Sequence, residues 1–124
     1  MMKTTLKVEH LGIAVDDLDA YIDIFTKMGG KVTFRGKAPD FEAECVFIDM
    51  GNIEIELIRG TVPGNHINRF IERYGCGFHH IAVSGDDIVM GHTRPGAKPG
   101  MEVSFSNPNK KNRVLIENVR YRKN

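Results

Sequence analysis

The sequence contains no tryptophan and two cysteines, Cys45 and Cys76, which are not spaced as a CxxC pair. So low a cysteine content excludes a small secreted domain held together by disulfides, and it fits a reducing compartment. Hydrophobic residues make up 41% of the chain and include seven phenylalanines. A chain of 124 residues can bury a core of aliphatic and phenylalanine side chains, so we expect one domain over residues 1–124.

The sequence also has no excess of charge and no long hydrophobic run. Seventeen lysines and arginines nearly balance sixteen aspartates and glutamates, so the net charge of +1 gives no electrostatic reason to expect a nucleic-acid partner. No apolar run approaches the roughly 18 residues of a membrane-spanning helix, and the first residues do not resemble a secretion signal. We therefore expect a cytoplasmic protein that binds neither nucleic acid nor membrane.

Alternating apolar and polar residues predict strands over much of the chain. These patterns cover residues 6–15, 31–35, 42–49, 53–58, 78–84, 101–106 and 113–119. One helix is expected between Asp16-Asp17 and Gly29-Gly30, and a shorter one over residues 65–74. The fold class is therefore α+β. We divide the expected domain into a first module (residues 6–60), a linker with the short helix (61–77) and a second module (78–119).

An internal repeat relates the two modules. Residues 10–18 (HLGIAVDDL) and 80–88 (HIAVSGDDI) both place a histidine on a strand that leads into an Asp-Asp pair. Later in each module a strand carries an Ile-Glu pair, which ends at Glu56 in the first and at Glu117 in the second. The second module has no room for a full helix after Asp87, and a strand could be missing as well. We therefore predict a second module that is truncated in its helix.

The repeated histidines and glutamates are candidate ligands of a divalent metal ion. By strand alternation each lies opposite the larger apolar residues of its strand, so all four should face away from the helix-covered side of the sheet. A strand histidine or glutamate on its own is more often an ordinary structural or solvated residue, and the repeat is what favours a site. Two imidazoles and two carboxylates suit Zn, Co, Ni, Mn or Fe. The predicted metal ligands are His10, Glu56, His80 and Glu117.

Four further polar residues are candidates of lower rank. Glu54 shares the face of Glu56 and is expected to be an exposed carboxylate. Alternation places His79 on the opposite face from its neighbour in the chain, as a surface residue or a residue behind the ligands. His66 and His92 fall at a helix start and in a loop, and we assign them no role.

At these residues the sequence resembles the vicinal oxygen chelate superfamily, which includes glyoxalase I, bleomycin-resistance proteins, extradiol dioxygenases and methylmalonyl-CoA epimerase. The resemblance covers roughly residues 6–119, and it is carried by residues 8–18, 50–58, 77–83 and 114–117. The string Gly-Phe-His-His-Ile-Ala is most similar to the epimerase branch. The resemblance implies paired βαβββ modules around a U-shaped metal cleft, a homodimer, and a metal ion on the four predicted ligands.

The resemblance also implies an activity. Epimerase-like members are metal-dependent isomerases that abstract a proton next to the carbonyl of an acyl-CoA, with the enolate held by the metal. Glu117 carries over as one acid/base group. The partner carboxylate belongs on the third strand, where Glu44 is the nearest candidate and Cys45 would take its place if the register differed by one. A related lyase or glyoxalase-type isomerase would use the same ligands.

Two other functions are compatible with the resemblance. An Fe(II) extradiol-type dioxygenase would need two histidines and one glutamate, and Glu56 as a fourth ligand counts against it. A non-catalytic small-molecule-binding protein of the bleomycin-resistance kind needs no metal. The presence of all four ligand types counts against that function, whereas the truncated second module favours it.

Overall fold

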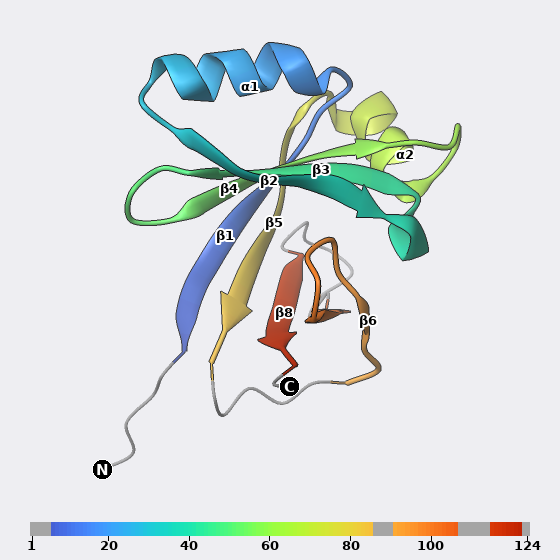
Figure 1. The fold of residues 1–124 in the computed structure, drawn as a ribbon. Coiled ribbons are helices and arrows are strands. Elements are labelled where there is room, and N and C mark those ends of the chain that lie inside the picture. Colours follow the sequence, from blue (N-terminus) through green and yellow to red (C-terminus); the bar gives the residue numbers. More distant parts are fainter. Residues whose placement is uncertain (1–5, 86–90, 107–114, 123–124) are drawn as a thin grey trace.

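The structure, a computed structural model, describes residues 6–85, 91–106 and 115–122. It is a curled eight-stranded mixed sheet made of two βαβββ-like modules (Figure 1), which confirms the predicted α+β fold. The strands are β1 (Lys7–Ala14), β2 (Lys31–Ala38), β3 (Ala43–Asp49), β4 (Glu54–Gly60), β5 (Gly77–Ser84), β6 (Arg94–Pro95), β7 (Met101–Ser106) and β8 (Ile116–Tyr121). The helices are α1 (Leu18–Lys27), α2 (His66–Tyr74) and a short 3-10 helix (Pro39–Phe41).

The strand order shows the relation between the modules. The sheet runs β2-β3-β4-β1-β5-β8-β7-β6, so the first module is mirrored by the second in the sequence of its strands. Within each module the first strand is parallel to the last, β1 to β4 and β5 to β8. The antiparallel pair β1 and β5 joins the modules. The four central strands are consequently those that carry the repeated histidines and glutamates.

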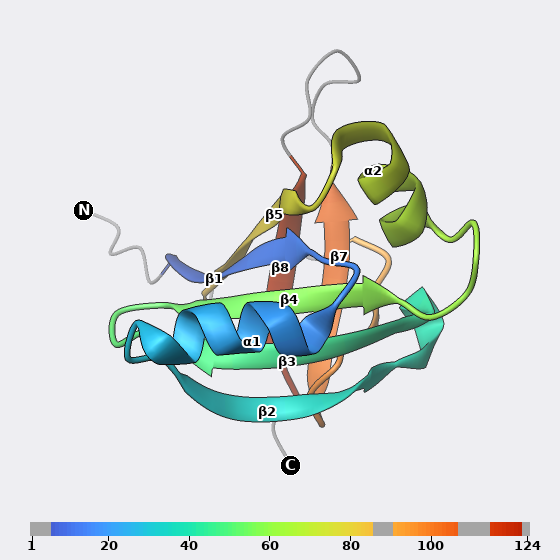
Figure 2. The ribbon, with the colours of Figure 1, turned by 90° about the horizontal axis from the view of Figure 1, so that it is seen from above.

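Helix α1 covers the outer face of the first module. Asp17 caps its start, because a side-chain oxygen accepts a hydrogen bond from the amide of Ala20 at 3.2 Å. The helix lies across β3 and β4 (Figure 2). Its apolar stripe, which includes Tyr21, Ile22 and Phe25, packs against buried residues of those strands such as Leu57. This face of the sheet is therefore filled and is not open to a ligand.

The inner, concave face has its own apolar cluster. Phe47 and Ile58 belong to it, whereas their chain neighbours Val46 and Leu57 belong to the cluster under α1. The alternation that predicted two faces for each strand is thus confirmed on β3 and β4. Strands β7 and β8 close the inner cluster from the second module, for example through Val103.

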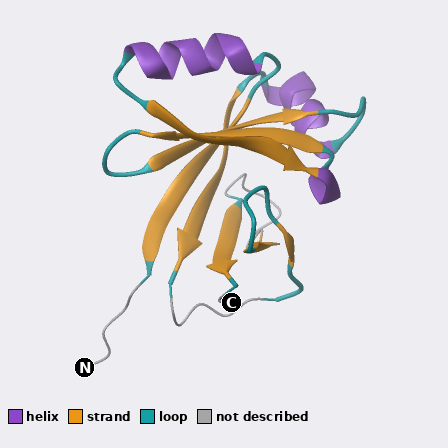
Figure 3. Ribbon diagram, viewed as in Figure 1, coloured by secondary structure: helices purple, strands orange, loops and turns teal. Residues whose placement is uncertain are grey.

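The second module contains a shortened β6 of two residues and, among its described residues, no helix (Figure 3). The expectation that a strand could be missing is wrong, because β6 pairs with β7 over Arg94 and Pro95. Residues 86–90, which include the second Asp-Asp pair of the repeat, lie outside the described residues. None of the described helices has the length and apolar character needed to span a membrane.

Asn65 connects α2 to the first module, and its replacement by alanine should destabilise the protein. Its side-chain oxygen accepts from the amide of Asn68 at 2.9 Å, and its amide donates to the carbonyl of Glu42 at 2.7 Å. Because both bonds are partly buried, we expect Asn65→Ala to lower the free energy of unfolding by about 1–3 kcal/mol. Asp17→Ala, which removes one exposed capping bond, should cost at most about 1 kcal/mol. Urea unfolding measures both, and equal losses would contradict this ranking.

Candidate metal centre

The sheet register places the four predicted ligands in two rows on the concave face. Each row has a small residue in its centre: Glu56 and His80 flank Gly12, and Glu117 and His10 flank Ala82. Each row therefore contains one candidate ligand from the first module and one from the second. A larger side chain at the centre of either row would occupy the space into which the imidazole and the carboxylate extend. For Gly12 this is explicit, because an added Cβ would collide with the ring of His80.

The four side chains meet through one atom each, and these atoms all lie within 4.8 Å of one another. Nε2 of His10 lies 3.2 Å from Oε1 of Glu56 and 3.0 Å from Oε1 of Glu117. Nε2 of His80 lies 3.0 Å and 3.7 Å from the same two oxygens. The two Nε2 atoms are 3.2 Å apart. All four residues are at least 95% buried.

This arrangement fits a divalent cation. Oε1 of Glu56 and Oε1 of Glu117 are buried, and neither is aligned to accept a hydrogen bond although a histidine nitrogen is close to each. A buried carboxylate oxygen without a hydrogen bond is costly unless a positive charge compensates it. A metal ion with ligands at about 2.1 Å separates adjacent ligand atoms by roughly 3.0–3.4 Å, and the distances around His10 lie close to that range.

The electrostatics of the cluster are dominated by the contacts between histidine and carboxylate. Burial would lower the pKa of His10, but the carboxylates of Glu117, Glu56 and Glu9 raise it to about 11. Burial would raise the pKa of Glu56, but its contacts with His10 and His80 hold it well below its usual range. In the metal-free protein a proton on His10 therefore compensates part of the buried negative charge.

Each ligand histidine is held from behind by the residue that precedes it. Nδ1 of His10 lies 3.0 Å from a carboxylate oxygen of Glu9, which also accepts from the hydroxyl of Tyr121 at 3.2 Å. Nδ1 of His80 lies 2.8 Å from Nδ1 of His79. Such partners orient a ligand imidazole and fix which nitrogen is free to bind. Both chain neighbours thus belong to the site.

These contacts correct the prediction for His79. The pairing of β1 with β5 shifts register at two places, and each shift leaves an extra residue: Glu9 on β1 and His79 on β5. An extra residue interrupts the strict alternation of side chains along a strand. His79 is consequently buried beside its chain neighbour, with 7% of its surface exposed. Period-2 reasoning missed Glu9, and it expected His79 on the wrong face although one of its two alternatives was a residue behind the ligands.

A small cavity of about 20 Å³ adjoins the cluster, which is about enough space for one water molecule. Three of the candidate ligands, Glu56, His80 and Glu117, line it. The rest of its lining is mostly apolar or aromatic. It consists of Ala38, Phe41, Cys45, Ile58, His66, His79, Gly96, Ala97, Met101 and Phe105. An apolar surrounding of this kind strengthens electrostatic interactions with any charge that develops inside it.

The structure separates the two candidates for the partner carboxylate. Glu44 does not reach the cluster: its carboxylate lies 3.3 Å from both Arg35 and Arg59, and Arg35 also contacts Asp19 of α1. Cys45 lines the cavity instead. Burial, followed by the nearby carboxylates of Glu56 and Glu117, raises the pKa of the Cys45 thiol far above its usual range. On β3 it is therefore Cys45, the alternative to Glu44, that faces the site.

The remaining candidates have defined environments. Glu54 is not a free surface carboxylate, because it binds Lys98 at 2.7 Å and Thr33 at 2.8 Å. The ammonium of Lys98 also lies 4.1 Å from the centre of the Phe47 ring, so this contact holds residues 96–100 against the first module. His66 lines the cavity, and His92 is exposed.

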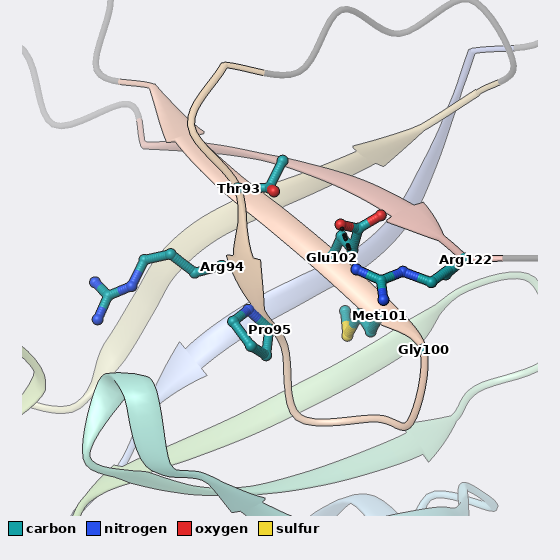
Figure 4. A pocket seen from close by; sticks show the side chains of 7 residues that line it. All are labelled: Thr93, Arg94, Pro95, Gly100, Met101, Glu102 and Arg122. Carbon is teal, nitrogen blue, oxygen red and sulfur yellow. Dashed lines mark hydrogen bonds and ion pairs between the residues drawn. The ribbon is translucent and has the colours of Figure 1, made fainter.

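A larger hollow of about 290 Å³ lies elsewhere, between the β6–β7 hairpin and Arg122 (Figure 4). Its acidic residue, Glu102, is paired with Arg120 at 3.4 Å and with Arg122 at 3.3 Å. None of the four candidate ligands lines this hollow. The smaller cavity is therefore the better candidate site, because it combines burial with convergent metal-binding groups.

The chain belongs to the glyoxalase/bleomycin resistance protein/dioxygenase superfamily, whose model matches residues 9–94. This confirms the resemblance that the sequence showed. The uncharacterized protein YqjC of Bacillus subtilis (strain 168) is 25% identical over 126 residues, which cover 90% of this chain and 89% of the relative. The mitochondrial methylmalonyl-CoA epimerase of Homo sapiens is 27% identical over 84 residues, which cover 66% of this chain and 48% of the relative.

Solved structures share the fold. A hypothetical protein of Bacillus halodurans C-125 has a TM-score of 0.85 and 24% identity, with 97% of each chain covered. A variant methylmalonyl-CoA epimerase of Streptomyces coelicolor, in complex with 2-nitronate-propionyl-CoA, has a TM-score of 0.79 and 22% identity. That match covers 91% of this chain and 95% of the other.

Metal uptake should release a proton from His10. Below its pKa of about 11 the metal-free imidazole is protonated, and it must lose that proton before Nε2 can bind a cation. We expect about one proton released per metal ion, and an affinity that rises about tenfold per pH unit near neutrality. Calorimetric titration in buffers of different ionisation enthalpy measures the proton count. A binding heat that does not depend on the buffer would contradict this assignment.

Gly12→Ala should disrupt the site without replacing any of the four candidate ligands. The new methyl group would collide with the His80 imidazole and displace it. We expect unfolding to become easier by about 1–3 kcal/mol and metal affinity to fall at least about tenfold. Gly77→Ala is the matched control, because a Cβ on this strand glycine would meet no atom within 4 Å. Retention of full metal affinity by Gly12→Ala would show that His80 is not a ligand.

Proposed function

We propose that this protein is a metal-dependent isomerase or lyase that abstracts a proton next to the carbonyl group of a small substrate. One observation carries the proposal: two imidazoles and two carboxylates converge in a buried cluster that borders an apolar cavity. A structural role does not require four polar groups to be buried with two carboxylate oxygens lacking hydrogen bonds. Such a set is expected where a cation binds and a reaction generates negative charge.

Glu117 is the proposed base. It lines the cavity, is 5% exposed, and lies on β8 at the edge of the cluster. A carboxylate that faces an apolar cavity can take a proton from a substrate carbon held there, since water does not compete for it. A divalent cation bound to the four ligands would supply electrostatic stabilisation of the enolate oxygen. His10, Glu56 and His80 would hold that cation together with Glu117 itself.

An acyl-CoA is the proposed substrate class. The support is the sequence similarity to an enzyme named methylmalonyl-CoA epimerase, over 84 residues, and a fold shared with an epimerase in complex with an acyl-CoA analogue. The cavity of about 20 Å³ is too small for an acyl group. Substrate entry therefore requires its cover, which includes Phe41, Ala97 and Phe105, to move outward.

The position of Glu44 favours removal and return of the proton on one side of the substrate carbon. Epimerisation would instead require removal on one side and return on the other. An epimerase needs an acid and a base on opposite sides of the substrate carbon, and Glu44 lies on the other face of the sheet from Glu117. Among the described residues that line the cavity, the carboxylates are Glu56 and Glu117, and both belong to the cluster. Proton exchange and stereochemical inversion should therefore be measured separately.

The decisive measurement is deuterium incorporation from D2O at the α-carbon of methylmalonyl-CoA by the metal-loaded protein. Glu117→Gln should slow this exchange by about 10²–10⁴-fold, because it removes the base but keeps a ligand oxygen. Glu44→Gln should exchange within a few-fold of the wild type, since Glu44 faces Arg35 and Arg59. The metal content of each variant is determined in parallel, so that loss of metal is not mistaken for loss of the base.

The outcomes separate the candidate functions. Absence of exchange in fully metal-loaded wild type would overturn the proposed activity on acyl-CoA. Exchange without inversion would support a one-sided isomerase or lyase and exclude an epimerase. Wild-type rates in metal-loaded Glu117→Gln would remove Glu117 from the role of base.

A further inference from the structure

We infer that His79 is a positioning residue of the metal centre: its Nδ1 accepts a hydrogen bond from Nδ1 of His80 and thereby directs Nε2 of His80 towards the cluster. The inference rests on the proposed function in one respect, that the four-residue cluster binds a metal ion. It adds a role for a residue that is not itself one of the four candidate ligands.

The tautomers follow from the geometry. A ligand nitrogen must have a free lone pair, so a neutral His80 that binds through Nε2 carries its proton on Nδ1. This Nδ1 lies 2.8 Å from Nδ1 of His79, and one proton must lie between the two nitrogens. His79 must then accept, with its own proton on Nε2.

The backbone and the surrounding rings hold His79 in place. The extra residue on β5 lets His79 and His80 both face inward, whereas normal alternation would have placed these two neighbours on opposite faces of the sheet. Inside, its ring packs edge-on against Phe70 with centroids 5.0 Å apart, and it lies 6.0 Å from His66. A packed ring cannot rotate away from His80 without opening a gap, so the acceptor is preorganised.

The equivalent position in the first module has a different charge. Glu9 occupies the extra position on β1 and binds Nδ1 of His10 at 3.0 Å. A divalent ion with two carboxylate ligands is already neutral, and Glu9 adds one negative charge. A second carboxylate behind His80 would add another in a buried site, which would be costly. A neutral imidazole supplies the acceptor without that charge, and this accounts for the histidine at position 79.

The test compares His79→Phe with His79→Asn. Phenylalanine keeps the packing against Phe70 but cannot accept a hydrogen bond, whereas the asparagine oxygen can take the place of Nδ1. We expect His79→Phe to bind Zn²⁺ and Co²⁺ about 10–100-fold more weakly than the wild type and to alter the Co²⁺ absorption spectrum. His79→Asn should restore most of both. Affinities are measured by competition with a chelator, and thermal unfolding of the metal-free variants reports whether they fold.

His92→Phe is the control for the loss of a histidine, because His92 is exposed and does not line the cavity. It should leave metal affinity unchanged. Nitrogen-15 NMR of the zinc-loaded wild type gives an independent reading, with a proton on Nδ1 of His80 as the expected result. Wild-type affinity and spectrum in His79→Phe, or an Nδ1 of His80 without a proton, would overturn the inference alone. A wild type that takes up no metal would overturn the proposed function and this inference together.

Discussion

The convergence of two buried carboxylates on two imidazoles is the interaction on which the rest of this structure depends. Glu56 and Glu117 each place a buried oxygen where no described residue offers it an aligned hydrogen-bond donor. Such a cluster is stable only with compensating positive charge, which a proton on His10 supplies in part and a divalent ion would supply in full. The curl of the sheet is what brings these groups together, since each comes from a different central strand. The stability of the fold therefore depends on the charge balance in this cluster as well as on the apolar core.

This charge balance explains features that apolar packing does not require. Gly12 and Ala82 are small because an imidazole and a carboxylate extend over each of them from the neighbouring strands. The two register shifts between β1 and β5 each direct one extra residue inward, Glu9 in one module and His79 in the other. Regular pairing would leave both ligand histidines without a partner on Nδ1. The irregularities of the central strand pair are thus part of the site, as is common for bulges.

The sequence predicted every described strand except β6, the two helices and the four members of the cluster, because these depend on alternation and on an internal repeat. Both signals are local and survive without knowledge of the tertiary structure. It placed His79 on the wrong face, because an extra strand residue is determined by pairing with a distant strand and leaves no mark on alternation. The choice between Glu44 and Cys45 failed for a related reason. A shift of one residue exchanges the two faces of a strand, and the residues before β3 form a short 3-10 turn that hides the register.

The second module has no helix among its described residues, and this affects access to the site more than its chemistry. All four cluster residues lie on β1, β4, β5 and β8, whose pairing is complete, so a helix on the outer face is not needed to position them. The cavity is covered instead by the segment that contains Gly96 and Ala97, and Lys98 binds it to Glu54 of the first module. The ligand set and the cover are therefore separate structural elements. In the proposed function the cover selects the substrate and the cluster abstracts the proton, so a relative could share the proposed reaction class and still act on a different substrate.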